Sequence, residues 1–233
     1  MYASRMESRV RFIPLFNLLF LFIVLVGEFF LPLWIEWDLA ISKPSSDDEI
    51  RLLVMADPHI QLYHPYWYYV EYFSLLDSDR YLRRYFRRVR RLTEPDAILI
   101  LGDLVEVERL KQYFISSHGV PCFVVPGDND VGGDWNDPMS TERCERFKRA
   151  FGHLSFPKRI KFAKLYGYVP WPQHNDVSFT DDSDIVIFLS HHPIITPYGA
   201  GFPETMIHLK PAILISGHDH VVSLSFIMCM LSF

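Results

Sequence analysis

The stretch Ala97–Glu106, AILILGDLVE, decides the fold. Its first five residues are apolar and rich in Ile and Leu, which is typical of a short strand buried on both faces. The strand is followed at once by Gly102-Asp103, so a carboxylate comes directly after the apolar run. Ligands bind at the carboxyl ends of strands in open α/β sheets, which makes Asp103 the first candidate for a functional side chain.

Four other short runs have the same form, an apolar stretch followed by a polar cluster. They are Arg51–Ala56, Cys122–Val125, Asp184–Leu189 and Ala212–Ile215. Between the first two strands, the apolar residues of Asp79–Leu92 recur at helical spacing. A second helix is expected at Thr141–Phe151, entered from Asp137-Pro138. Strands that alternate with helices predict the α/β class.

The composition limits the class of protein. With 233 residues, 49% of them hydrophobic, the chain is too apolar to be disordered and long enough for one domain with a core. A formal net charge of −5 argues against a nucleic-acid partner, because such proteins usually carry a basic excess. Three cysteines without a C-x-x-C pair exclude a zinc ribbon or a disulfide framework, and whether Cys122 and Cys144 pair stays open.

Residues 12–35 carry a membrane signal. Their one charged residue is Glu28, and a helix of this length spans about 30 Å of hydrocarbon. Arginines precede the segment and acidic residues follow it, which predicts a cytosolic amino terminus. The alternative is a cleaved signal peptide, disfavoured because no small-residue cleavage site lies near 28–37. We therefore expect a cytosolic basic tail at 1–11, a transmembrane signal anchor at 12–35, a linker at 36–49 and a lumenal domain at 50–233.

The helix expected at 79–92 is unusually basic. Its seven arginines are Arg80, Arg83, Arg84, Arg87, Arg88, Arg90 and Arg91. Such a face could bind acidic lipid headgroups or phosphate. A solvated charged face is the simpler interpretation, and the sequence alone favours it.

Each of the five expected strands is followed by carboxylates or imidazoles. The clusters are Asp57-Pro58-His59, Gly102-Asp103 with Glu106, Gly127-Asp128-Asn129-Asp130, His191-His192 and Gly217-His218-Asp219-His220. Mixed nitrogen and oxygen donors suit Mn, Fe or Zn. The donors are numerous enough for two ions that share a bridging carboxylate. One such cluster alone is weak, but five in order at strand ends predict a metal site.

The order D-x-H, G-D-x-x-E, G-D-N-D, H and G-H-x-H resembles the signature of calcineurin-like metallophosphoesterases, over roughly Arg51 to His220. The resemblance implies a four-layer α/β/β/α sandwich, here preceded by one transmembrane helix, and two divalent metal ions. Manganese is the expected metal, with iron or zinc as alternatives. By position, Asp57, His59 and His220 would hold one metal, and His191 and His218 the other.

The remaining roles also follow from the resemblance. Asp103 would bridge both metals, and Asp128 occupies the position of the family's Asn ligand to the second. Catalytic roles are expected for Asn129, Asp130 and His192. Asp130 and Glu106 are also candidates for orienting the loops or the ligating imidazoles.

The apolar amino terminus and the segments ADPH, DSDRYLRR, GDNDVGG and ERFKRAFG are similar to a membrane-anchored branch that remodels glycosylphosphatidylinositol (GPI) anchors. This branch removes ethanolamine phosphate from the glycan with manganese, so the implied partners are the bilayer and a GPI-anchored protein. The implied location is the ER exit sites, the ER–Golgi intermediate compartment or the Golgi. Alternatives are a phosphatase of phosphoproteins or nucleotides, and a non-catalytic metal-stabilised binding or trafficking module.

Two departures from the family pattern matter. Asn129 stands where the family has a His, and an amide cannot deliver a proton near neutral pH. His64 or His192 could act as the acid instead. The chain also ends soon after His220, where the family continues through further strands, so we expect a domain that is incomplete at its carboxyl end.

Overall fold

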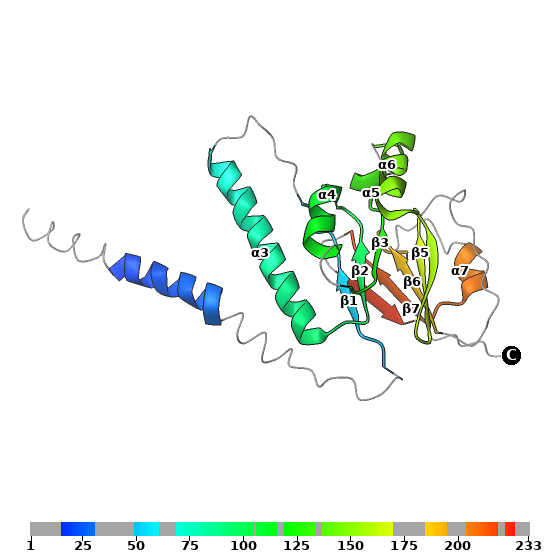
Figure 1. The fold of residues 1–233 in the computed structure, drawn as a ribbon, viewed down its shortest axis with the longest axis horizontal. Coiled ribbons are helices and arrows are strands. Elements are labelled where there is room, and N and C mark those ends of the chain that lie inside the picture. The colour runs from blue at the N-terminus through cyan, green and yellow to red at the C-terminus, as the bar shows by residue number, and fades with distance from the viewer. Residues whose placement is uncertain are drawn as a thin grey trace, which may run out of the picture.

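Two β-sheets lie at the centre of the fold (Figure 1). The computed structural model describes residues 15–30, 49–60, 69–104, 106–115, 119–133, 137–169, 185–194, 204–218 and 222–226. The first sheet has three parallel strands in the order β1-β2-β3, with β1 at Leu52–Met55, β2 at Ala97–Leu101 and β3 at Cys122–Val125. These bounds confirm the first three expected strands, since β1 lies within the predicted Arg51–Ala56.

The second sheet is mixed and has five strands in sequence order. They are β4 at Phe156–Ile160, β5 at Ala163–Tyr168, β6 at Ile185–Ser190, β7 at Ile213–Ser216 and β8 at Ser223–Phe226. Strands β5, β6 and β7 are parallel, while β4 and β8 pair antiparallel at the two edges. Two strands, β6 and β7, match the predicted runs to within one residue.

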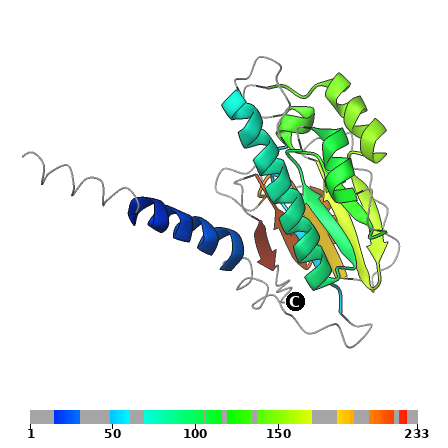
Figure 2. The ribbon, with the colours of Figure 1, turned by 60° about the vertical axis from the view of Figure 1, so that its left-hand side comes forward.

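Among the residues that the structure describes, six helical segments lie between 69 and 209. They are α3 at Tyr69–Thr93, α4 at Val107–Leu110, η2 at Lys111–Ile115, α5 at Asp128–Val131, α6 at Thr141–Phe151 and α7 at Glu204–Leu209. Figures 1 and 2 show α3 and α6 over one face of the three-stranded sheet, and Figure 1 shows α7 beyond the five-stranded sheet. The mixed α/β class expected from the sequence is therefore confirmed.

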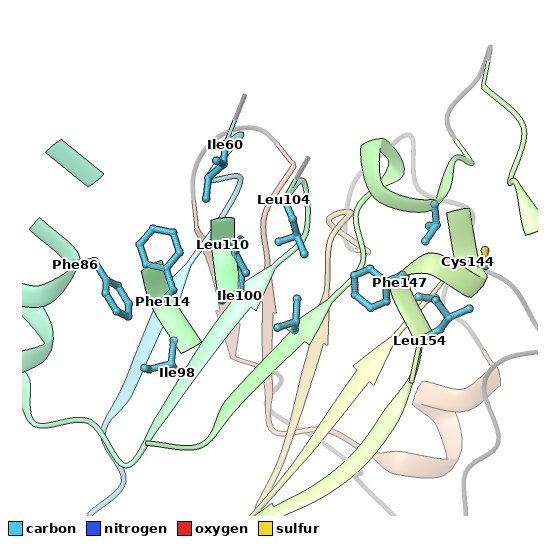
Figure 3. Packing of buried hydrophobic residues seen from close by; sticks show 13 residues of the cluster. Ile60, Phe86, Ile98, Ile100, Leu104, Leu110, Phe114, Cys144, Phe147 and Leu154 are labelled. Atoms are coloured by element: carbon cyan, nitrogen blue, oxygen red, sulfur yellow. The ribbon is translucent and has the colours of Figure 1, made fainter. Parts of the chain in front are cut away.

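Successive apolar side chains of β2 point to opposite faces of the sheet, so that one face packs on helices and the other on the second sheet. Ile98 and Ile100 point towards the helices, where Phe114 meets Phe86 edge-on at 4.7 Å between ring centroids (Figure 3). On the opposite face, Leu99 belongs to a buried cluster with residues of the five-stranded sheet, including Leu165 and Leu189. A third cluster joins the outer face of that sheet to α7 through Tyr166, Phe188, Leu214, Met206 and Leu209. The order of layers is thus helices, sheet, sheet, helix.

The predicted start of the first long helix was wrong by ten residues. The helical spacing of Tyr81, Tyr85 and Val89 suggested a helix that begins at Asp79. The helix instead begins at Tyr69, and Asp79 lies in its interior. Its buried carboxylate is satisfied there by an ion pair with Arg109 and a hydrogen bond from Tyr113, so it does not need a helix terminus.

The strands β4, β5 and β8 were not predicted. In β4, proline and two cations occupy exposed positions of an edge strand, where they interrupt the apolar pattern. In β5, Lys164 and Gly167 interrupt it in the same way, although Lys164 is buried. The helix expected at Thr141–Phe151 is confirmed, but its N-cap is Ser140, whose hydroxyl accepts a hydrogen bond from the Arg143 amide.

Residues 15–25 are helical and continue as the π-helix η1, Val26–Phe30. Of the residues described, none belongs to a helix both long and apolar enough to cross a bilayer. The anchor at 12–35 stays a prediction. Cys122 and Cys144 are both free thiols, so these two residues do not form a disulfide in this structure.

We predict that Leu99→Ala lowers the free energy of unfolding of the full chain by about 2–5 kcal/mol, because it opens a cavity between the two sheets. Chemical denaturation followed by tryptophan fluorescence measures the change. The control is Lys158→Ala on exposed β4, which should stay within about 0.5 kcal/mol of the parent. Equal costs for the two variants would contradict packing of the sheets across Leu99.

Candidate metal centre

The carboxyl ends of five strands bring their polar clusters together. Two groups of side chains each place one ligand atom per residue within 4.8 Å of the others. One group contains Asp57, Asp103 and His191, and the other contains Asp128, His191, His192 and His218. His191 belongs to both groups, so the two possible metal positions are adjacent and share a residue.

The backbone at this site is held in uncommon conformations. Seven non-glycine residues of the described chain have positive φ, and four of them are predicted metal ligands. These four are Asp57 (φ 49°), His59 (φ 39°), Asp103 (φ 55°) and His218 (φ 75°). Such conformations cost of order 1–3 kcal/mol each and cluster at functional sites. Their gathering here is independent structural support for a site at the strand ends.

Gly102 permits the close approach on which the site depends. Its φ is +85°, and a Cβ at this position would lie 2.6 Å from both the Gly127 nitrogen and His191 Nδ1. A side chain would therefore separate the ends of β2 and β3 and displace the shared imidazole. Glycine is required here both for its backbone conformation and for the space it leaves.

His191 is oriented as a metal ligand. Its Nδ1 lies 2.7 Å from the Leu101 carbonyl, an acceptor, so Nδ1 carries a proton, and in the neutral form of the ring the lone pair is on Nε2. Nε2 lies 2.8 Å from Asp128 Oδ1 and 3.5 Å from Asp103 Oδ1. Its lone pair and these carboxylate oxygens are all acceptors, and a divalent cation among them would satisfy every one.

Burial makes the carboxylates of the first group costly without a cation. The side chains of Asp57 and Asp103 are 1% and 4% exposed. Burial raises the pKa of Asp57; nearby His191 opposes this shift, while the charge of Asp103 adds to it. Two buried carboxylates of like charge side by side fit a divalent ion, which would compensate both.

The second group is electrostatically different. Burial alone would raise the pKa of Asp128, but a backbone hydrogen bond and the imidazoles of His191, His192 and His218 outweigh it, and the pKa is lowered. The aspartate that replaces the family's Asn is therefore ionised at neutral pH. His218 Nδ1 lies 3.4 Å and His192 Nε2 3.7 Å from Asp128 Oδ1.

His192 was one of two candidates for the acid that replaces the family's His. The structure places it among the possible metal ligands of the second group. Burial, together with the neighbouring His191 and His218, lowers the pKa of His192 to about 4. At neutral pH its ring is neutral, a form suited to binding a metal or accepting a proton, and poorly suited to donating one.

Asn129 and Asp130 bind protein groups rather than facing open space. Asn129 Nδ2 donates to Asp103 Oδ2 at 2.8 Å, and its backbone amide donates to Asp103 Oδ1 at 3.2 Å. Asp130 is buried and accepts from the amides of Leu104 and Gly127, each at 2.9 Å. Asn129 therefore orients the expected bridging carboxylate, and Asp130 ties together the loops after β2 and β3, the second role expected for it.

The other predicted residues lie at the margin of the site or outside the described chain. His59 Nε2 is 3.5 Å from Asp103 Oδ2, but His59 is in neither group of converging ligands. Glu106 lies just before α4 and is likewise in neither group. His220 and His64 lie outside the described residues. The sequence analysis did not predict that the Leu101 carbonyl orients His191. The signal available in the sequence was the position of Leu101 as the last residue of the apolar run, directly before Gly102.

Comparison with known proteins agrees with this geometry. The sequence model of the family described as calcineurin-like phosphoesterase matches residues 50–222. The chain belongs to this family. The matched calcineurin-like phosphoesterase domain includes both groups of converging ligands. It is a domain of metal-dependent phosphoric ester hydrolases, and the divalent metal that this class requires fits the donor set described above.

Two curated relatives are similar over about half of the chain. Metallophosphoesterase 1 homolog of Drosophila melanogaster is 28% identical over 127 residues, which cover 48% of this chain and 33% of the fly protein. Cell division control protein 1 of Saccharomyces cerevisiae is 27% identical over 139 residues, which cover 52% of this chain and 27% of the yeast protein. The matches therefore span a third or less of each relative's length. No solved structure matches the chain.

We predict that the full chain, equilibrated with Mn²⁺ and freed of excess metal, retains roughly two ions. His191→Asn should retain at most one, because His191 belongs to both ligand groups. Elemental analysis and the rise in Tm on adding Mn²⁺ measure the difference. His208→Asn, at an exposed position of α7, is the matched control and should behave like the parent chain. Undiminished metal content in His191→Asn would overturn the shared-ligand arrangement.

Proposed function

We propose that the chain is a membrane-anchored phosphoesterase that hydrolyses a lumenal phosphodiester with two divalent metal ions, Mn²⁺ first, with Fe or Zn as alternatives. The observation that carries the proposal is the convergence of two ligand groups on His191 at the ends of parallel strands. In this assignment Asp57 and Asp103 belong to one metal, and Asp128, His192 and His218 to the other. His59 and His220 complete the first metal's ligands, as the family resemblance implies.

The residues around the ions would position the substrate and govern proton transfer. Two bound ions would supply an activated water and a clamp for the phosphoryl oxygens. Asn129 fixes Asp103 through two hydrogen bonds, and so fixes the carboxylate of the first group that the family resemblance assigns to both metals. Asp128 adds a negative charge near the second position, which favours metal retention and weakens the Lewis acidity of that ion.

The site lacks a good proton donor for the leaving group. Asn129 has no proton to transfer at neutral pH, and His192 is neutral because its pKa is about 4. General acid catalysis contributes typically about 10²–10⁴-fold. The site should therefore hydrolyse esters of acidic alcohols and phenols much faster than esters of ordinary alcohols.

The narrower proposal concerns the substrate, which we take to be ethanolamine phosphate on GPI glycans. Its support is the similarity of the segments DSDRYLRR, GDNDVGG and ERFKRAFG to the GPI-remodelling branch, together with the apolar amino-terminal segment. The compartment proposed with it is the ER exit sites, the ER–Golgi intermediate compartment or the Golgi.

Substrate preference tests this proposal. The full chain with Mn²⁺ should hydrolyse a GPI glycan bearing ethanolamine phosphate with a kcat/KM at least about tenfold above a phosphopeptide or a nucleotide, about 1.4 kcal/mol of discrimination. His191→Asn should lose about 10²-fold or more on every substrate, because it removes the shared ligand. His208→Asn should lose nothing. Preference for another ester would refute the GPI substrate and leave the phosphoesterase standing.

Restoring the family's acid tests the leaving-group argument. We expect Asn129→His to raise kcat for an alkyl phosphodiester by about 10-fold or more, and to change kcat for bis(4-nitrophenyl) phosphate little, because nitrophenolate leaves without a proton. The ratio of the two rates measures the effect and cancels losses in folding. An unchanged ratio would contradict a role for position 129 in protonation.

The second candidate function is a non-catalytic, metal-stabilised binding or trafficking module. Asn129 at the position of the family's His is the observation that favours it. This candidate predicts bound metal without turnover. It would replace the enzyme proposal if the Mn²⁺-loaded parent chain and Asn129→His both fail to hydrolyse every phosphodiester tested.

A further inference from the structure

One face of α3 carries a continuous exposed stripe. Its residues follow one another at intervals of three or four, the spacing that keeps side chains on one side of a helix. They are Phe73, Leu76, Arg80, Arg84, Arg87 and Arg91, and all six are exposed. The stripe extends over 19 residues, from Phe73 to Arg91, or about 27 Å of helix. Figures 1 and 2 show α3 along the outside of the helix layer.

The opposite side of α3 is buried. Phe86 and partly buried Leu82 pack into the cluster beneath the helices, and Leu75 is buried as well. The stripe is therefore not needed for folding the core. Its two large apolar side chains remain in water, with Phe73 65% and Leu76 45% exposed.

The charge beside the stripe is strongly positive. A groove of about 780 Å³ runs along α3, lined by Leu76, Asp79, Arg80, Arg83, Arg84, Arg87, Arg88, Arg91, Leu92 and Tyr113. Its single acid, Asp79, is paired with Arg109. The Arg83 guanidinium lies 4.4 Å from the centre of the Tyr113 ring, which holds it at the wall of the groove. From Arg80 to Arg91 the sequence contains no acidic residue.

We propose that this stripe is a docking site for the surface of an anionic lipid bilayer. The arginines would bind phosphate and carboxylate groups of the lipids. Phe73 and Leu76 would enter the boundary between headgroups and acyl chains, as apolar residues of interfacial helices do. A soluble phosphate would contact the arginines alone, whereas a bilayer would also contact Phe73 and Leu76, which are exposed in the same row; this favours the bilayer.

The site is separate from the metal centre. The proposal rests neither on the proposed hydrolysis nor on the proposed lumenal side, since the anionic surface of a cell membrane is chiefly that of its cytoplasmic leaflet. It also differs from the apolar amino-terminal segment, because its attraction is electrostatic and falls with salt. The docking site can therefore be tested in the full chain by measuring its preference for anionic over neutral lipid. The apolar segment does not produce such a preference, because its burial in hydrocarbon needs no anionic lipid.

The experiment is vesicle flotation of the full chain at limiting lipid in 0.1 M salt. Vesicles of phosphatidylcholine alone are compared with vesicles in which three lipids in ten are phosphatidylserine. The parent chain should prefer the anionic vesicles by about tenfold or more. Arg84→Gln/Arg87→Gln/Arg91→Gln should reduce this preference to about twofold or less, while its hydrolysis of bis(4-nitrophenyl) phosphate equals that of the parent.

The matched control neutralises three exposed cations elsewhere, as Arg146→Gln/Arg149→Gln/Lys158→Gln, and should keep the preference. Phe73→Ala/Leu76→Ala should weaken binding to anionic vesicles at equal charge. An undiminished preference in the α3 triple variant would overturn the proposal, as would an equal loss in the control. Tight binding of tripolyphosphate to the parent, measured by calorimetry, without a preference for anionic vesicles would assign the groove to a soluble phosphate instead and would also overturn it.

Discussion

The site depends on the hydrogen bond between His191 Nδ1 and the Leu101 carbonyl, 2.7 Å long. Leu101 ends β2 in the three-stranded sheet, and His191 follows β6 in the five-stranded sheet. The bond therefore joins the two sheets at the edge where their strands end. It also sets the ring's tautomer, because the proton on Nδ1 leaves Nε2 free to face Asp103 and Asp128.

The packing between the sheets keeps this bond in place. Leu99 and Val125 on one sheet and Leu165, Ile187 and Leu189 on the other form a buried cluster behind the site. That rigid base can hold four ligand residues at positive φ, conformations that an isolated loop would not keep. The buried carboxylates also depend on this packing. Burial raises the pKa of Asp57, which means that its charged form is disfavoured, so the surrounding structure must hold it in place. The packing of the core thus keeps the possible metal ligands in fixed positions.

The sequence predicted those parts of the fold in which local pattern and tertiary environment agree. The runs at β2 and β3 are apolar throughout and both strands were placed correctly, because parallel strands buried between layers have that pattern. At β4 and β5, Pro157, Lys164 and Gly167 break the pattern, and only pairing with a neighbour makes these segments strands. Asp79 was mistaken for a helix start because its ion pair with Arg109, thirty residues away, leaves no local trace.

The presence of a metal site could be predicted from the sequence, but the role of each side chain in it could not. The residue types after each strand suffice to indicate a metal, because parallel strand ends must meet at one edge of a sheet. The functions of individual side chains depend on distances instead. Two residues illustrate this dependence. Asn129 donates a hydrogen bond to Asp103, and His192 lies among the possible ligands of the second group.

The distribution of charge links the metal centre with the rest of the molecule. The chain is acidic overall, yet seven of its 23 Lys and Arg residues lie between Arg80 and Arg91 on α3. Carboxylates gather at the strand ends, where a cation can compensate them, and arginines gather on the outside of the helix layer. Folding keeps Arg109 with Asp79 at the inner side of α3, and so fixes which side of that helix carries the exposed positive stripe. The buried ion pair of Asp79 therefore helps to orient α3, and with it the exposed stripe of arginines.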